Sequence, residues 1–269
     1  GAMPERSRGV DWIGTEMTAA DRPGGRLFVG RRDLLDDLRL RLREGRGFAV
    51  ATLNLDHVVK LRSDPAFRAA YAAHSHVTAD GHPVVWLERL AGRTAERVTG
   101  ADLVLPLARI AADEGRSVAL VGSTEAALGA AGRRLAAEVP GLNVSSRIAP
   151  GIGFDPDSAE ADAVLDGLVA SGAHLCLLAL GAPLQERFAA RAAAHLPSAG
   201  FVSVGAGLDF IAGHQVRAPR LVQAAAMEWA WRAARDPRRL GARYARCAAT
   251  LPLLAFAAAR RRAPHPRDL

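Results

Sequence analysis

Short apolar segments alternate with amphipathic helical segments along most of this chain, and that alternation limits the folds open to it. Helical periodicity covers residues 31–43, 57–73, 83–91, 100–114, 124–138, 157–171 and 183–195. Segments typical of strands cover 26–30, 47–55, 117–122, 142–148, 174–180 and 201–205, with a shorter β-type stretch before Asp80. Short buried strands that alternate with helices form a parallel sheet covered on both faces. We therefore predict an α/β fold with a Rossmann-like parallel-sheet core.

The pattern changes near residue 213, after which only helical segments follow, at 219–235, 237–247 and 251–262. This change predicts an α/β catalytic domain over 25–213 and an all-helical appendage over 214–269. Residues 1–24 are charged and loop-like, and their first three residues resemble a tag scar. We expect residues 1–24 to be a flexible leader outside the fold.

The positive charge is concentrated in the appendage. Residues 213–269 hold 12 arginines against Glu228, Asp236 and Asp268, a balance of +9. Because the whole chain carries +7, the remainder carries −2. Such an excess at one end predicts contact with phosphate groups or with an anionic membrane surface. We predict no nucleic-acid partner.

Several classes of protein are excluded by simple features. Cys176 and Cys247 are the only cysteines, which rules out a disulfide framework and fits a cytoplasmic protein. No apolar run approaches the roughly 20 residues that span a bilayer. No glycine-rich segment has the spacing of a dinucleotide fingerprint or an ATP-binding P-loop, so those sites are not expected.

The loops after the predicted strands carry most of the polar residues that could bind a ligand, because ligands of such sheets bind beyond the carboxyl ends of the strands. Each loop alone is a weak signal, since glycine after a strand is ordinary turn chemistry. The candidates are Thr52 and Asn54, Asp80 and Gly81, Gly122, Gly181 and Gln185, and Gly205 and Asp209.

Two groups of residues resemble metal sites by composition, and neither is convincing. His74, His76 and Asp80 lack a further close ligand. Asp155 and Asp157 precede a helical segment, where Asp157 is better interpreted as a helix N-cap. We therefore predict no metal site and no cofactor.

Read in order, these loops resemble one family of enzymes. The segments "ADGHPVVW", "ERVTGADLV", "GAPLQE" and "VGAGLDFIAG", followed by "RAPR", "EWAWR" and "DPRR", are similar to successive signatures of the WecG/TagA/CpsF glycosyltransferases. The resemblance covers about residues 25–246. It implies an inverting transferase that moves a sugar, commonly N-acetylmannosamine or its uronate, from a UDP donor. The acceptor would be a sugar linked to polyprenyl diphosphate at the cytoplasmic face of the membrane, where the enzyme would bind peripherally.

The resemblance also implies roles for individual residues. Asp80 would be the general base, Thr52 and Asn54 would hold sugar hydroxyls, and Gln185 would contact the donor. Thr99 and Asp102 would contact the nucleotide. The arginines of the appendage would neutralise the departing diphosphate: Arg217, Arg220, Arg232 and Arg239. Relatives often carry one more arginine at the position of Ala242, and whether Arg243 replaces it stays open. The resemblance also implies self-association into a homo-oligomer.

Three hypotheses remain at this point. The first is the membrane-bound transferase just described. The second is a same-fold transferase acting on a soluble acceptor, for which the basic appendage would matter less. The third is a membrane-docked scaffold subunit of glycan assembly that has lost turnover, against which the intact Asp80, Thr52 and Asn54 and the set of arginines argue. For Asp80 itself, the alternative to a general base is a helix cap.

Overall fold

The computed structural model describes residues 28–224 and 227–262, and its centre is a parallel sheet of six strands. The strand order is β2-β1-β6-β5-β3-β4, and every pairing is parallel. The strands are β1 (Phe48–Leu53), β2 (His76–Ala79), β3 (Val118–Gly122), β4 (Val144–Ile148), β5 (Leu175–Ala179) and β6 (Gly200–Ser203). The predicted fold class is confirmed.

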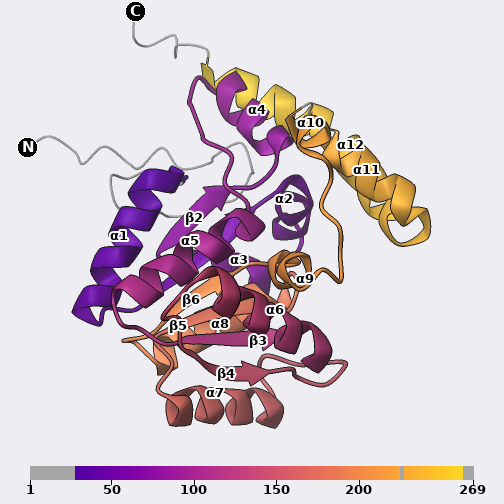
Figure 1. The fold of residues 1–269 in the computed structure, drawn as a ribbon. Coiled ribbons are helices and arrows are strands. Elements are labelled where there is room, and N and C mark those ends of the chain that lie inside the picture. The colour runs from indigo at the N-terminus through magenta and orange to yellow at the C-terminus, as the bar shows by residue number, and fades with distance from the viewer. Residues whose placement is uncertain (1–27, 225–226, 263–269) are drawn as a thin grey trace, which may run out of the picture.

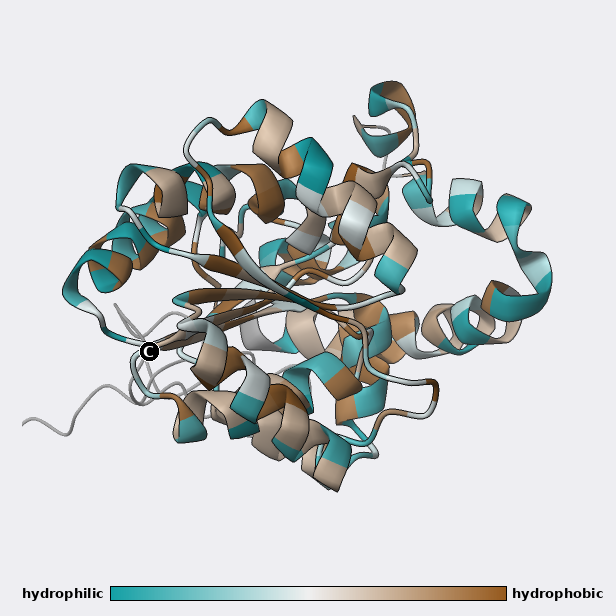
Figure 2. Cartoon of the chain, turned by 60° about the horizontal axis from the view of Figure 1, so that its bottom comes forward, coloured by the Kyte–Doolittle hydropathy of each residue, from teal (hydrophilic) through white to brown (hydrophobic). Residues whose placement is uncertain are grey.

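Helices cover both faces of this sheet (Figures 1 and 2). On one face, Leu120 and Leu177 of the strands pack against α1 (Arg31–Glu44), α5 (Gly100–Asp113) and α6 (Glu125–Glu138). On the other face, Val121 and Leu178 pack against α7 (Ala159–Ser171) and α8 (Leu184–His195). Successive side chains of a strand point to opposite faces, which is why adjacent residues enter different clusters.

A third apolar cluster joins the appendage to the body. It contains residues from α2 (Leu55–Leu61), α3 (Pro65–Ala72) and α4 (His82–Leu90). The long α12 (Pro237–Arg262) inserts Leu254 and Ala258 into it, and both side chains are fully buried. The remaining helices are the short α9 (Gly207–Ala212), α10 (Arg220–Ala224) and α11 (Glu228–Arg235). In the described ranges, no helix has the length and apolarity needed to cross a membrane.

Some predicted elements differ from those observed. The strand predicted over 26–30 is wrong in its described part, where Phe28 forms only a single bridge with Val77 before α1 begins at Arg31. The helix predicted over 57–73 is divided into α2 and α3, because the Asp64 side chain caps a new helix whose first residue is Pro65. Asp157 is not the cap of α7; Ser158 caps it, and Asp157 pairs with Arg187 at 2.6 Å.

The glycine-rich segment 204–213 contains α9, which was not predicted as a helix. In the appendage, the helix predicted over 219–235 is divided into α10 and α11. The two helices predicted after it form the single α12, which continues through Pro252. Leu251 packs on the body just before the proline, and Leu254 and Ala258 pack on it just after, which stabilises the helix around the hydrogen bond that proline cannot make.

Candidate active site

The loops that follow five of the strands lie along one edge of the sheet, because all the strands are parallel. In the register of β1 and β2, Leu53 pairs with Ala79, which places Asn54 next to Asp80. The order of the strands then continues the edge through the loops at Gly205, Gly181 and Gly122. The predicted loops therefore lie at one edge, although not all their side chains point into one pocket.

Asp80 follows the last residue of β2, and its backbone is fixed from two sides. Its N–H donates to the Leu53 carbonyl at 2.8 Å, and the preceding residue, Ala79, forms a parallel bridge with Arg97. Desolvation by the surrounding protein raises the pKa of the Asp80 carboxyl to about 6, although a hydrogen bond from Thr52 and the charge of Arg97 act in the opposite direction. A carboxyl group with this pKa can accept a proton near neutral pH.

Gly81 separates the carboxylate from the start of α4 and has φ +94°, a conformation that disfavours any residue with a Cβ. Asp80 is therefore not the N-cap of α4; Gly81 occupies that position and offers no side chain for capping. The interpretation of Asp80 as a simple helix cap is wrong.

Thr52 lies near the end of β1 and Asn54 follows it, and both are hydrogen-bonded to neighbouring buried side chains or backbone. The Thr52 carbonyl accepts a hydrogen bond from the Tyr71 hydroxyl at 2.5 Å and lies 3.0 Å from Nδ1 of His57. Burial lowers the pKa of His57 to about 4, so this ring is neutral at physiological pH. The Asn54 side-chain oxygen accepts from the His57 N–H at 2.8 Å and caps α2. Asn54 therefore has a structural role as the cap of α2.

Thr99 and Asp102 start α5, and Arg217 binds both of them. The Thr99 hydroxyl caps the helix, and it also accepts from Arg217 at 3.2 Å. Arg217 Nη1 lies 2.6 Å from Asp102 Oδ1. Although burial opposes ionisation of Asp102, the hydrogen bonds from Arg217 and Thr99 leave its pKa below the ordinary value. Arg217 was predicted to neutralise a diphosphate; here its charge is already balanced by protein carboxylates.

Glu228, the first residue of α11, extends this network to the body. Its carboxylate lies 3.0 Å from Arg97 Nη2 and 3.8 Å from Arg217 Nε. A third contact between appendage and body lies nearby, where Nε2 of His82 is 2.9 Å from the Gln223 carbonyl oxygen. These contacts hold the start of the appendage against the loops that carry Asp80 and Thr99.

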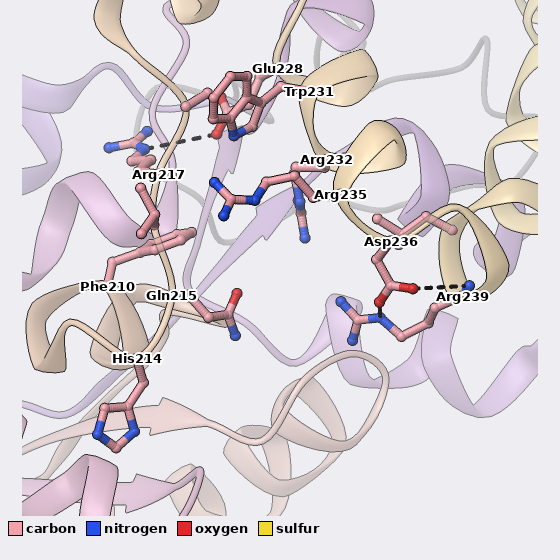
Figure 3. A pocket seen from close by; sticks show the side chains of 13 residues that line it. Phe210, His214, Gln215, Arg217, Glu228, Trp231, Arg232, Arg235, Asp236 and Arg239 are labelled. Carbon is pink, nitrogen blue, oxygen red and sulfur yellow. Dashed lines mark hydrogen bonds and ion pairs between the residues drawn. The ribbon is translucent and has the colours of Figure 1, made fainter.

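A cavity of about 340 Å³ opens beside this network, between the loop after α9 and helices α11 and α12 (Figure 3). Arg217, Arg232, Arg235 and Arg239 line it together with the aromatic Phe210 and Trp231. Arg239 pairs with Asp236 at 2.8 Å, and Arg235 lies over the Trp231 ring. Within the described part of the chain, Arg232 has no carboxylate within ion-pair distance. Since Arg235 is held over a ring and the other two arginines are paired, Arg232 is the cavity-lining arginine best suited to bind an anion.

The glycines of the loops after β3, β5 and β6 do not line the cavity. Gly122 has φ +111°, and a Cβ there would lie 2.3 Å from the Ala179 carbonyl oxygen. The next residue, Ser123, donates to Asp209 at 2.5 Å, which ties this loop to α9. Asp209 therefore contacts the loop after β3.

Gln185 was predicted to contact the donor. Its side chain is buried, and its oxygen accepts from the Gly205 N–H at 3.2 Å. Its amide nitrogen donates to Glu186, whose carboxyl is fully buried and has its pKa raised to about 7 by desolvation. Gln185 therefore supports the loop after β6, while Gly181, with φ +73°, forms the turn that precedes α8.

Two predicted arginines lie outside the cavity lining. Arg243 pairs with Asp56 of α2 at 2.9 Å, so it ties α12 to the body. Arg220 begins α10 and is exposed.

Arg97 and Glu228 are the residues that sequence reasoning missed. Both lie inside motifs that were noticed, two residues before Thr99 and at the start of "EWAWR". Arginine at the end of a strand and glutamate at the start of a helix are common surface residues, so neither drew attention in the sequence. Their importance becomes visible only in the fold, where they form an ion pair although 131 residues separate them in the sequence.

No group of three or more His, Cys, Asp or Glu side chains in residues 28–224 and 227–262 is arranged to hold a metal ion. The two histidines that resembled part of a metal site in the sequence have protein partners instead. Nε2 of His76 lies 2.5 Å from Oδ2 of Asp37, and Nδ1 of His74 lies 2.6 Å from the Ala70 carbonyl oxygen.

The model of one protein family matches this chain. The match is to the Glycosyl transferase WecG/TagA/CpsF family and covers residues 29–267, which include the whole sheet, the strand-end loops and the described appendage. The resemblance inferred from the motifs is thereby confirmed. The chain belongs to the WecG/TagA/CpsF family and is a glycosyltransferase of cell-surface polysaccharide synthesis.

Proposed function

We propose that this transferase inverts the anomeric centre of a UDP-linked hexose-type sugar, such as N-acetylmannosamine or its uronate, with Asp80 as the general base. The observation that carries the proposal is the Asp80 carboxyl at the sheet edge, with its pKa raised to about 6 and a hydrogen bond from Thr52. Inversion needs one base on the side of the sugar opposite the leaving group.

The proposed sugar transfer is a single displacement at the anomeric carbon. The acceptor hydroxyl oxygen forms a bond to the anomeric carbon while the bond from that carbon to the β-phosphate oxygen breaks. The electron pair of the broken bond leaves with UDP, and the hydroxyl proton passes to Asp80. Gly81 leaves the space beside the carboxylate without a side chain.

The departing diphosphate needs positive charge, and Arg232 is proposed to supply it without a metal ion. We expect EDTA to leave the initial rate unchanged and Arg232→Ala to reduce kcat/KM for the donor about 10- to 100-fold, the range for a lost charge-assisted contact. Arg238→Ala is the matched control, because Arg238 is also an exposed arginine of the appendage but does not line the cavity. Strict dependence on Mg²⁺ or Mn²⁺, or a wild-type rate for Arg232→Ala, would contradict this assignment.

We further propose that the acceptor sugar is linked to polyprenyl diphosphate and that the appendage binds the inner face of the cell membrane. The support is the exposed apolar side chains of α12, Leu253 and Phe256, beside Arg260, whose Cζ lies 5.7 Å from the Phe256 ring centroid. A half-apolar, basic helix of this kind lies in a membrane interface rather than across it.

The experiment that tests the function is a screen of UDP-sugars against a short-chain lipid-diphosphate sugar, followed by mass spectrometry of the acceptor and measurement of released UDP. We expect one sugar to be added with stoichiometric UDP. If transfer to a water-soluble acceptor without lipid is as efficient as transfer to the lipid-diphosphate sugar, the soluble-acceptor hypothesis is favoured. Absence of transfer from every donor by the folded protein would favour an inactive scaffold subunit.

A further inference from the structure

Arg97 is paired with Glu228, and its charge also acts on a second carboxylate, that of Asp80. Through the bridge between Ala79 and Arg97, its backbone runs beside the residue preceding Asp80, and its charge acts on the Asp80 carboxyl. Its Nη2 nevertheless donates to Glu228 at 3.0 Å, and its Nε is buried without a hydrogen-bond partner among the described residues. The guanidinium therefore has an unused donor, the Nε–H group, in addition to the contact with Glu228.

A direct ion pair between Arg97 and Asp80 would harm a general base. It would occupy lone pairs that must receive the proton, and an adjacent opposite charge makes a carboxylate a weaker base. The charged groups that act on Asp80 are Arg97 and Asp102 from the segment around the start of α5 and Glu228 from α11. Since Asp102 is paired with Arg217, Glu228 is the carboxylate that competes with Asp80 for Arg97.

We propose that Glu228 is a positioning residue of the transferase site, which holds the Arg97 guanidinium from the appendage side and so leaves the Asp80 carboxylate available to accept the proton of the acceptor hydroxyl. The proposal rests on the proposed role of Asp80 as the base. It gives the appendage a second part in catalysis, because Glu228 acts on the proton acceptor whereas the arginines act on the leaving group.

The test is Glu228→Gln, which keeps the shape of the side chain and removes its charge. The carboxyl group of Asp80 is titrated by ¹³C NMR in aspartate-labelled protein, with Asp80→Asn used to assign its signal. We expect the midpoint of the Asp80 titration to fall by on the order of 1 pH unit. The acid limb of kcat/KM is expected to move to lower pH by the same amount. Glu125→Gln is the control, since Glu125 also lies in the first turn of a helix and is exposed.

The same titration in an Arg97→Gln background separates two ways in which Glu228 could act. If Glu228 works by holding Arg97, the shift caused by Glu228→Gln becomes smaller when Arg97 is absent. An equal shift in both backgrounds, or no shift in a folded Glu228→Gln protein, would overturn the proposal. Should Glu228→Gln fail to fold, Glu228→Asp keeps the charge, and it is expected to retain the wild-type acid limb; a full shift in that variant would also overturn the proposal.

Failure of this proposal can be distinguished from failure of the proposed function. The NMR titration reports the coupling between Glu228, Arg97 and Asp80 without any turnover. Activity of Asp80→Asn would remove Asp80 as the base, whereas an inactive Asp80→Asn with an unchanged Glu228→Gln profile would remove only the role of Glu228.

Discussion

Asp80→Asn is expected to reduce turnover about 100-fold or more, the usual scale for a lost general base, while the fold and the affinity for UDP are retained. The amide matches the shape of the carboxyl group and can still accept the hydrogen bond from Thr52, but it cannot take a proton. Turnover is measured as UDP release, UDP affinity by calorimetry and the fold by circular dichroism. Asp166→Asn, at an exposed position of α7, is the control.

The pH dependence of the wild-type enzyme follows from the same group. A base works only when it is deprotonated, and the pKa of Asp80 is about 6, so kcat/KM should fall as the pH decreases through about 6. The acid limb should be missing from the residual activity of Asp80→Asn. Near-wild-type turnover of the folded variant would remove Asp80 from the mechanism.

Replacing Leu253 and Phe256 with serine is expected to weaken binding to anionic vesicles about 100-fold without changing the fold. These side chains are 62% and 65% exposed, so little packing is lost, whereas each would contribute on the order of 1–2 kcal/mol on entering the interface. Vesicle flotation measures the partitioning, and activity on a water-soluble acceptor should be spared. Ile152 and Val169, exposed apolar residues of the body, provide the matched control pair.

Unchanged vesicle binding by the double variant would show that this face of α12 does not contact the membrane. The three consecutive arginines at 260–262 would add on the order of 1 kcal/mol each on an anionic surface. Substitution separates these effects better than truncation within α12, because a shortened chain would also lose Leu254 and Ala258 from the shared apolar cluster. Burial of one leucine alone is worth about 2–5 kcal/mol.

The sheet could be predicted from the sequence because each strand and helix has a local signature. The apolar strand around Leu177 and the amphipathic α5 need no tertiary information to be identified. Where tertiary packing decides, the prediction failed: residues 248–250 separate two predicted helices, whereas packing on α4 and α2 keeps α12 continuous through them. Similarly, the segment 26–30 has the composition of a strand, but its residue Phe28 forms only a single bridge, with Val77.

The site was predictable in position but not in its charge pairing. The parallel strands place Asp80, Asn54 and Gly205 at one edge of the sheet, independently of the contacts that their side chains make. Which arginine meets a phosphate depends on which carboxylates are near, and that is a property of the folded chain. Arg217 was given the same role as Arg232 from the sequence, yet it is paired with protein carboxylates.

The configuration of the product tests the central claim most directly. A single base at Asp80 and one displacement predict that the new glycosidic bond has the anomeric configuration opposite to that of the UDP-sugar, as measured from the ¹H–¹H and ¹³C–¹H coupling constants of the purified product. Formation of a product that keeps the configuration of the donor would require two successive displacements and a nucleophile, and it would contradict the role assigned to Asp80.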